Sequence, residues 1–205
     1  MKAVVQPLLQ SGLGIAQVHV GHTDLGKSER QRPLPQLPQQ RFAIQALSHA
    51  HPPILETRSV VWDDEADCAA CAAALASHPG VRGAFIELHG TLGAGKTTFV
   101  RHLLHALGVE GRVKSPTYAV MEPYELPGFN AWHFDFYRFD DPQEWEDAGF
   151  RDVFAAPGLK VAEWPEKAQG LLPAPDLRIA IAIGADERRH VSLAAVTPLG
   201  RELLQ

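Results

Sequence analysis

The stretch GTLGAGKTT at residues 90–98 constrains the fold more than any other part of the chain. It fits the pattern G-x-x-x-x-G-K-T, whose glycines let the backbone wrap so tightly that successive N–H groups point at phosphate oxygens. The apolar segment before it, GAFIELHG, is typical of a short strand, and KTTFVRHLLHALG after it has the apolar periodicity of a helix. A strand, a glycine loop and a helix in this order predict a nucleotide-binding site.

Five positions of this loop have predicted tasks. We expect Gly90, Gly93 and Gly95 to supply the tight backbone that surrounds the phosphates. The ammonium group of Lys96 is expected to reach the β- and γ-phosphates, and the helix that begins there adds the positive end of its dipole. The hydroxyl of Thr97 is expected to complete the coordination shell of a magnesium ion.

The other segments predict how a domain is built around the loop. TRSVVW and LKVAEW have the character of strands, whereas DCAACAAALA, capped by Asp63 or Asp64, and DPQEWEDAGF, ended by Gly149, have the character of helices. RIAIAI and HVSLAAV flank the polar turn GADERR, which predicts a hairpin. Strands that alternate with helices predict an α/β fold, a P-loop NTPase-type three-layer sandwich with a mostly parallel sheet and a C-terminal hairpin.

The first 53 residues differ in composition from the rest of the chain. They are rich in Gln, Pro and His and carry a formal charge of +3. Such a segment has little apolar surface to bury, so residues 1–53 are predicted to be a Pro/Gln-rich N-terminal extension, mobile or loosely packed. The globular pattern begins near Ile54, and residues 54–205 are predicted to form the P-loop domain.

The composition argues against several classes of protein. A formal charge of −5 with 21% charged residues lacks the basic excess of a stand-alone nucleic-acid binder, so another protein is expected to supply most contacts to any RNA. The chain has no apolar run of 18 residues and a poor signal peptide, so we expect no membrane span and a cytoplasmic location. Cys68 and Cys71 lack a second pair of zinc ligands, and we interpret them as small residues of a helix.

A phosphate-binding loop of this kind needs carboxylates for magnesium and for the attacking water. Two candidates stand at the ends of predicted strands, Asp135 in HFDFYR and Glu163 in VAEW. In KSPTYAV the hydroxyl of Thr117 could close on magnesium or the γ-phosphate only when a triphosphate is bound, as in a nucleotide-state switch; the alternative is the ordinary start of a strand. The guanine-reading pattern N-K-x-D is missing, so adenine is the expected base.

Four motifs together resemble one family. G-x-L-G-A-G-K-T-T, K-S-P-T-Y, H-F-D-x-Y-R and E-W-P, in this order over roughly residues 58–195, closely resemble the TsaE family, also called YjeE. The resemblance implies an ATPase that uses magnesium and is slow by itself. It also implies a role in forming threonylcarbamoyladenosine in the anticodon loop of tRNA, with TsaB and TsaD as protein partners and with tRNA contacted mainly through their complex.

The resemblance further implies roles for individual residues. It places residues 93–98, Ala94 and Thr98 among them, around the phosphates and Thr97 on magnesium. Asp135 and Glu163 match the essential acids, as catalytic residues and as metal ligands, and which acid holds magnesium stays open. The other matches are Ser115, Pro116 and Thr117 in a switch-like loop, Trp164 beside the second acid, Asp64 and Glu65 near an N-terminal nucleotide contact, and Arg188 or Arg189 in the closing hairpin.

Two other functions stay open at this point. A small P-loop kinase would transfer phosphate to a metabolite, but no segment resembles a lid for a phosphate acceptor. A nucleotide-sensing adaptor would bind ATP with negligible turnover, and its two acids and switch loop would serve only closure. The adaptor and the ATPase differ mainly in rate.

Overall fold

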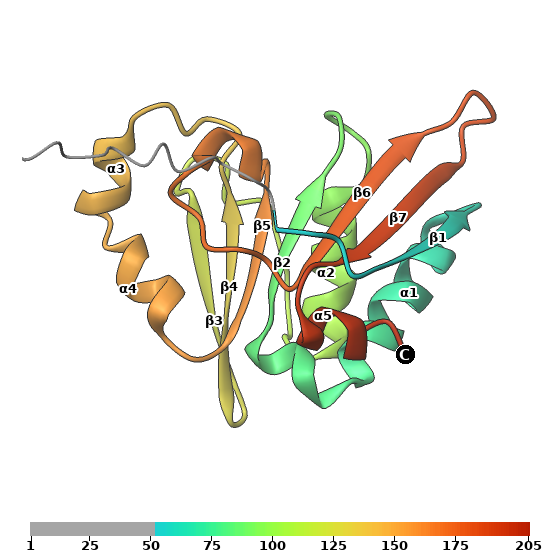
Figure 1. Cartoon of the computed structure of the whole chain (residues 1–205), viewed down its shortest axis with the longest axis horizontal. Helices are drawn as coiled ribbons and strands as arrows, with labels where there is room; N and C mark the ends of the chain where they lie inside the picture. Colours follow the sequence, from blue (N-terminus) through green and yellow to red (C-terminus); the bar gives the residue numbers. More distant parts are fainter. Residues whose placement is uncertain (1–51) are drawn as a thin grey trace, which may run out of the picture. The chain divides into compact units, whose positions relative to one another are not determined.

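A computed structural model describes residues 52–205, so the predicted N-terminal extension lies outside the described residues except for Pro52 and Pro53. The described residues form a seven-stranded sheet with the order β1-β7-β6-β2-β5-β4-β3 (Figure 1). The strands are β1 Glu56–Trp62, β2 Phe85–His89, β3 Met121–Leu126, β4 Phe129–Asp135, β5 Leu159–Glu163, β6 Leu177–Ile183 and β7 Arg189–Ala195.

The centre of the sheet is parallel and its two sides are antiparallel. β2 pairs in parallel with β5 and β6, and β4 pairs in parallel with β5. The hairpin of β6 and β7 forms as predicted, and β1 adds to β7 at one edge while β3 adds to β4 at the other. The predicted fold class is therefore confirmed, and the sequence did not reveal that both edges would be antiparallel.

Two helices cover one face of the sheet, α1 at Glu65–Ser77 and α2 at Lys96–Ala106. The Asp64 carboxylate accepts hydrogen bonds from the N–H groups of Ala66 and Asp67, which makes Asp64 the cap of α1. Apolar side chains of both helices form one core with inward-facing residues of β2, β5, β6 and β7. This core fixes the helix that follows the glycine loop against the strand that precedes it.

An aromatic core lies on the opposite face, beneath α3 at Pro142–Asp147 and α4 at Phe150–Ala155. The ring centroids of Phe134 and Phe136 are 5.6 Å apart, and both rings contact Phe150 edge-on. The sequence predicted a single helix here. The structure has two short ones, because Gly149 takes a positive φ of 67° and ends the first. With helices on both faces, the domain has three layers (Figure 1).

Short elements at the edges complete the domain. Two 3₁₀ turns, η1 Pro79–Gly83 and η2 Pro165–Ala168, follow α1 and β5, and a final helix, α5 Pro198–Glu202, was not predicted. Asp176 connects three elements, because its carboxylate accepts hydrogen bonds from the N–H of Phe85 at the start of β2 and from the hydroxyl of Thr197. Asp176, which directly precedes β6, therefore joins β6 to the start of β2 and to the N-terminus of α5.

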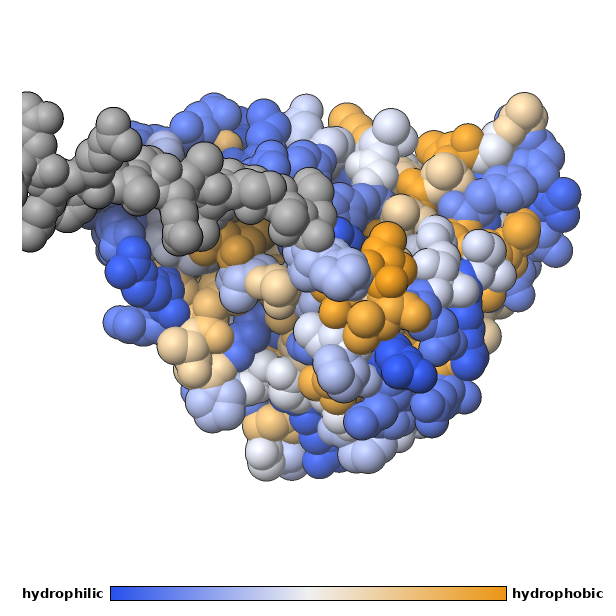
Figure 2. All heavy atoms as spheres, in the orientation of Figure 1, coloured by the Kyte–Doolittle hydropathy of each residue, from blue (hydrophilic) through white to orange (hydrophobic). Residues whose placement is uncertain are grey.

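The surface is mostly hydrophilic on the face seen in Figure 2, with hydrophobic residues in separate small groups. The most exposed of the large apolar side chains in the described residues are Tyr118 and Leu92, at 85% and 73%. None of the helices in residues 52–205 has the length and apolar character needed to cross a membrane.

Replacement of Asp176 tests its role as a connection between elements. Asp176→Ala should lower the free energy of unfolding by about 1–3 kcal/mol, because the buried N–H of Phe85 loses its acceptor. Urea denaturation measures the change. Asp140→Ala, which removes a carboxylate with an 84% exposed side chain, is the matched control and should be neutral. Equal midpoints for the two variants would contradict this role.

The two thiols test the interpretation of the C-x-x-C segment. Both cysteines lie in α1, where burial, with smaller contributions from Cys71 and Glu65, raises the pKa of Cys68 to about 12. Burial also raises the pKa of Cys71. At pH 8 both thiols should therefore react with a disulfide reagent at least ~10-fold more slowly in the native protein than in urea. Rapid native labelling of either cysteine would show a reactive thiol and refute the structural interpretation.

Candidate functional site

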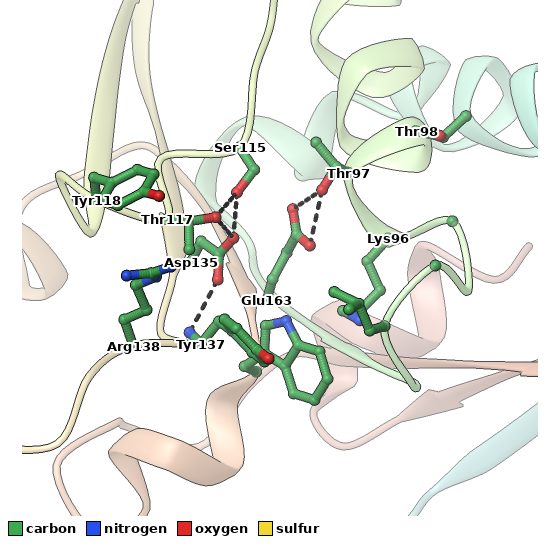
Figure 3. Close-up of a pocket in the computed structure, with 14 residues that line it drawn as sticks. Lys96, Thr97, Thr98, Ser115, Thr117, Tyr118, Asp135, Tyr137, Arg138 and Glu163 are labelled. Carbon is green, nitrogen blue, oxygen red and sulfur yellow. Dashed lines mark hydrogen bonds between the residues drawn. The ribbon is translucent and has the colours of Figure 1, made fainter.

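The ends of three strands and the start of one helix meet at a single pocket. The glycine loop follows β2, Asp135 is the last residue of β4, and Glu163 is the last residue of β5. Because β5 pairs in parallel with both neighbours, Glu163 lies opposite Leu88 on one side and Asp135 on the other. The pocket has a volume of about 380 Å³. Its lining residues are Leu92, Gly93, Gly95, Lys96, Thr97, Thr98, Ser115, Thr117, Tyr118, Asp135, Tyr137, Arg138, Glu163 and Trp164 (Figure 3).

The glycine loop forms a cradle whose backbone favours glycine at three positions. Gly90 has a φ of 144°, and a Cβ atom there would lie 2.5 Å from the carbonyl oxygen of Ile181, so the loop packs tightly on β6. Gly93 and Gly95 also have positive φ, but a Cβ atom on either would meet only open space. Since both residues line the pocket, a side chain on either would project into the space that the phosphates are predicted to fill.

Lys96 lies inside the cradle and is only 4% exposed. Its Nζ donates hydrogen bonds to the carbonyl oxygens of Gly90 (2.7 Å) and Thr91 (2.9 Å), and it lies 3.9 Å from the centre of the Trp164 ring. Burial lowers the pKa of Lys96, and the nearby carboxylates of Glu163, Asp135 and Glu166 oppose that shift. Two loop carbonyls and the Trp164 ring thus hold the ammonium group over the loop, where a phosphate could accept a further hydrogen bond from it.

Glu163 and Thr97 are already in contact. The Thr97 hydroxyl donates to the Glu163 carboxylate, at 2.8 Å from Oε1 and 3.0 Å from Oε2. Glu163 is 2% exposed, and its Oε1 also lies 2.9 Å from Nε2 of His133, which is fully buried on β4. This carboxylate therefore reaches across from β5 to the start of α2.

Asp135 holds the loop that precedes β3. Its Oδ2 accepts hydrogen bonds from the hydroxyls of Ser115 and Thr117, the latter at 2.8 Å, and its Oδ1 accepts the backbone N–H of Tyr137 at 2.9 Å. Figure 3 shows these bonds as a group separate from the bonds between Thr97 and Glu163. The predicted switch loop is thus attached to one acid, and the glycine loop to the other.

Two residues with strained backbones flank the pocket. Val120 ends the switch segment with a φ of 63°, and Trp164 follows Glu163 with a φ of 56°. Positive φ is unfavourable for residues other than glycine and costs about 1–3 kcal/mol, so the surrounding bonds must hold both in place. Val120 is held by hydrogen bonds of its N–H to Pro116 and of its carbonyl oxygen to the N–H of Asp135. Both residues thus belong to segments where the sequence predicted movement or binding, whereas Glu187, with a φ of 63°, lies in the turn between β6 and β7.

The residues present fit a magnesium nucleotide. Magnesium prefers oxygen ligands and keeps several waters when it binds with phosphates, so few protein ligands are needed. The Thr97 hydroxyl and the carboxylates of Glu163 and Asp135 supply such oxygens around the pocket, and the open cradle and Lys96 suit phosphates. In residues 52–205 no cluster of three His, Cys, Asp or Glu side chains could hold a metal independently of a nucleotide.

The structure brings most of the predicted site residues together, but not all. Gly90 and Ala94 form the base of the cradle and do not line the pocket. Among the looser matches, Asp64 caps α1, Glu65 contacts His102, and Arg188 contacts Asp63 and Asp186. None of these, nor Arg189, lines the pocket, so their predicted nucleotide contacts find no support in the geometry.

The sequence did not single out four residues at or beneath the pocket. Tyr118 and Arg138 both line the pocket and contact each other, with the guanidinium 4.5 Å from the ring centre. Tyr137 lies 5.0 Å from Trp164. These side chains and His133 all occur inside the quoted motifs KSPTY and HFDFYR, so the signal was present. Only the fold shows that three of these side chains line the pocket and that the fourth, His133, contacts Glu163.

Several known proteins are similar to this chain in sequence or in fold. Residues 62–191 match the family described as "Threonylcarbamoyl adenosine biosynthesis protein TsaE". The protein named tRNA threonylcarbamoyladenosine biosynthesis protein TsaE from Haemophilus influenzae is 44% identical over 119 residues, 58% of this chain and 75% of that protein. The protein of the same name from Bacillus subtilis is 35% identical over 114 residues, 56% of this chain and 71% of that protein. The crystal structure of Bacillus subtilis YdiB superposes with a TM-score of 0.60 at 25% identity, covering 73% of this chain and 92% of that one.

Removal of the Lys96 ammonium tests the cradle. Lys96→Ala should weaken ATP binding at least ~30-fold, because a buried charge facing the phosphates is lost. Isothermal calorimetry with a non-hydrolysable ATP analogue measures the affinity. Lys167→Ala, which removes an ammonium group from a half-exposed side chain outside the pocket, is the control. If Lys96→Ala binds as tightly as the control, the glycine loop is not the phosphate site.

Proposed function

Because the chain belongs to the TsaE family, we propose that it is a magnesium-dependent ATPase that supports the formation of threonylcarbamoyladenosine in tRNA. In this proposal it works with the TsaB–TsaD complex in the cytoplasm. The relatives carry this modification in their names, and the role in tRNA modification is carried over from them.

One observation carries the ATPase part of the proposal. Glu163 is nearly fully buried, yet its carboxylate is bonded to the hydroxyl of Thr97 in the glycine loop. A surface acid at the end of a strand would be hydrated and free. A buried acid that contacts the hydroxyl expected to hold magnesium supports the proposal, because hydrolysis of a nucleotide needs a carboxylate beside the metal.

The residues of the pocket divide the work of the reaction. Lys96 and the loop N–H groups would bind the β- and γ-phosphates, and Thr97 with Glu163 would hold magnesium, which when bound neutralises charge on the phosphates. Asp135 would support the attacking water and, through Ser115 and Thr117, report the state of the nucleotide to the switch loop. A protein contact that moves this loop could therefore alter the rate.

The net charge of the domain favours contact with tRNA through protein partners. The chain has a formal charge of −5 and its first 51 residues carry +3, so residues 52–205 carry −8. A domain of that charge repels the phosphates of RNA rather than attracting them. Contacts to tRNA are therefore assigned to the TsaB–TsaD complex, with this chain joined to it as the ATPase.

The decisive experiment measures ATP hydrolysis with magnesium, first by the chain alone and then with TsaB, TsaD and tRNA. We expect a low rate alone and a clear acceleration with the complex. A rate near zero under every condition, with ATP still bound, would replace the ATPase by a nucleotide-sensing adaptor. Transfer of the γ-phosphate to a small metabolite, independent of the proteins, would instead indicate a kinase.

Glu163→Gln separates binding from turnover. The variant keeps the shape of the side chain but loses its charge, so in EDTA it should bind ATP within about threefold of the wild type, whereas with magnesium it should hydrolyse ATP roughly 100-fold more slowly. Glu202→Gln makes the same chemical change at an exposed position of α5 and should hydrolyse ATP normally. Full activity of Glu163→Gln would transfer the essential role to Asp135.

A further inference from the structure

One buried polar side chain beside the pocket has no role in the function proposed so far. His133 lies on β4 and is 0% exposed. Its Nε2 is 2.9 Å from Oε1 of Glu163, whereas its Nδ1 is buried with no hydrogen-bond partner among the described residues. An unpaired buried polar atom costs about 1–3 kcal/mol, which an apolar side chain at this position would avoid. The histidine must therefore provide something that compensates for this cost.

Its hydrogen bond to Glu163 has a defined direction. An ionised carboxylate only accepts hydrogen bonds, so Nε2 of His133 is the donor and its proton lies between the ring and Oε1. In the neutral ring Nδ1 then keeps a lone pair, which is the less costly of the two nitrogens to leave without a partner. The pairing of β4 with β5 fixes the geometry, because His133 lies opposite Val161, two residues before Glu163.

The two oxygens of Glu163 consequently differ. Oε1 faces two donors, the ring N–H of His133 and the Thr97 hydroxyl, which together fill its two acceptor positions. The single proton of the Thr97 hydroxyl is shared between the two oxygens, at 2.8 Å from Oε1 and 3.0 Å from Oε2, so Oε2 has no donor of its own and keeps acceptor capacity. Oε1 is therefore anchored to the sheet, and Oε2 is the oxygen left with capacity for a further ligand.

We infer that His133 is a positioning residue, which anchors Oε1 of Glu163 so that Oε2 faces the magnesium nucleotide in a fixed orientation. This inference rests on the proposed function, since it assigns Glu163 to the metal. His133 does not line the pocket, so in this inference it acts through Glu163 alone. Partners that orient metal ligands in this way typically account for 10–100-fold in metal affinity or activity.

Three substitutions separate the hydrogen bond from the volume of the ring. His133→Gln can place an amide N–H near the position of Nε2 and should keep the bond to Oε1. His133→Asn carries the same amide on a shorter side chain, which cannot reach that position. His133→Leu fills the space without a donor. Gln and Asn are thus matched in chemistry and differ in reach, and thermal unfolding of each variant establishes that it is folded.

The first readout is equilibrium binding of a fluorescent ADP analogue, with magnesium and with EDTA. The ratio of the two affinities measures how much magnesium strengthens binding, independently of turnover. We expect His133→Leu and His133→Asn to reduce this ratio about tenfold while affinity in EDTA stays unchanged. His133→Gln should remain within about threefold of the wild type. In ATP hydrolysis the same two variants should lower kcat and raise the magnesium concentration needed for half-maximal rate.

The outcomes distinguish this inference from the function on which it rests. A wild-type chain that binds no nucleotide under either condition would overturn the proposed function and this inference with it. If the wild type shows the magnesium effect and His133→Leu and His133→Asn show it equally, His133 does not position Glu163. If His133→Gln fails as badly as His133→Leu, the ring serves only packing, and the inference is also overturned. If His133→Leu does not fold, the magnesium effects of His133→Gln and His133→Asn still test the inference, because only the glutamine can reach Oε1 of Glu163.

Discussion

The parallel pairing of β5 with both β2 and β4 is the constraint on which the site depends. Carboxyl ends of parallel strands meet at one edge of a sheet, so the glycine loop after β2, Glu163 at the end of β5 and Asp135 at the end of β4 lie side by side. These three parts are far apart in the sequence. The core under α1 and α2 and the aromatic core under α3 and α4 hold the strands in this register from both faces.

Two hydrogen-bonded groups then attach different loops to the two acids. Glu163 bonds to Thr97 and His133, and therefore to α2 and β4, while Asp135 bonds to the switch loop through Ser115 and Thr117. The acids are neighbours in register but share no partner. Both acids end strands of the sheet, but only Asp135 is bonded to the loop whose end, Val120, is strained. Separate attachments of the two loops suit the ATPase proposed above, in which a partner would act on the switch loop.

Most of what could be predicted came from the glycine loop at residues 90–98 and the segments on either side of it. The glycine loop, the strand before it and the helix after it are determined locally, because their glycines, apolar periodicity and Lys96 and Thr97 lie within one continuous segment. The caps and turns at Asp64 and Gly149 are local for the same reason, although the break at Gly149 was predicted as an end and not as a joint between two helices. The two acids were identified as strand ends, which the structure has.

Which strands would be neighbours, and which polar atoms would meet, could not be predicted from the chain alone. The pairing of β1 with β7 joins residues near opposite ends of the domain, and the bond between Phe85 and Asp176 joins residues 91 positions apart. His133 illustrates the physical reason. In sequence it is one polar residue of an alternating strand, and only the packing of β4 against β5 removes water from its ring and places Glu163 within hydrogen-bonding distance. The sequence by itself determined the glycine loop with its lysine and threonine, whereas the tertiary structure decided which buried groups surround that loop, because burial and long-range contacts arise only when distant segments pack together.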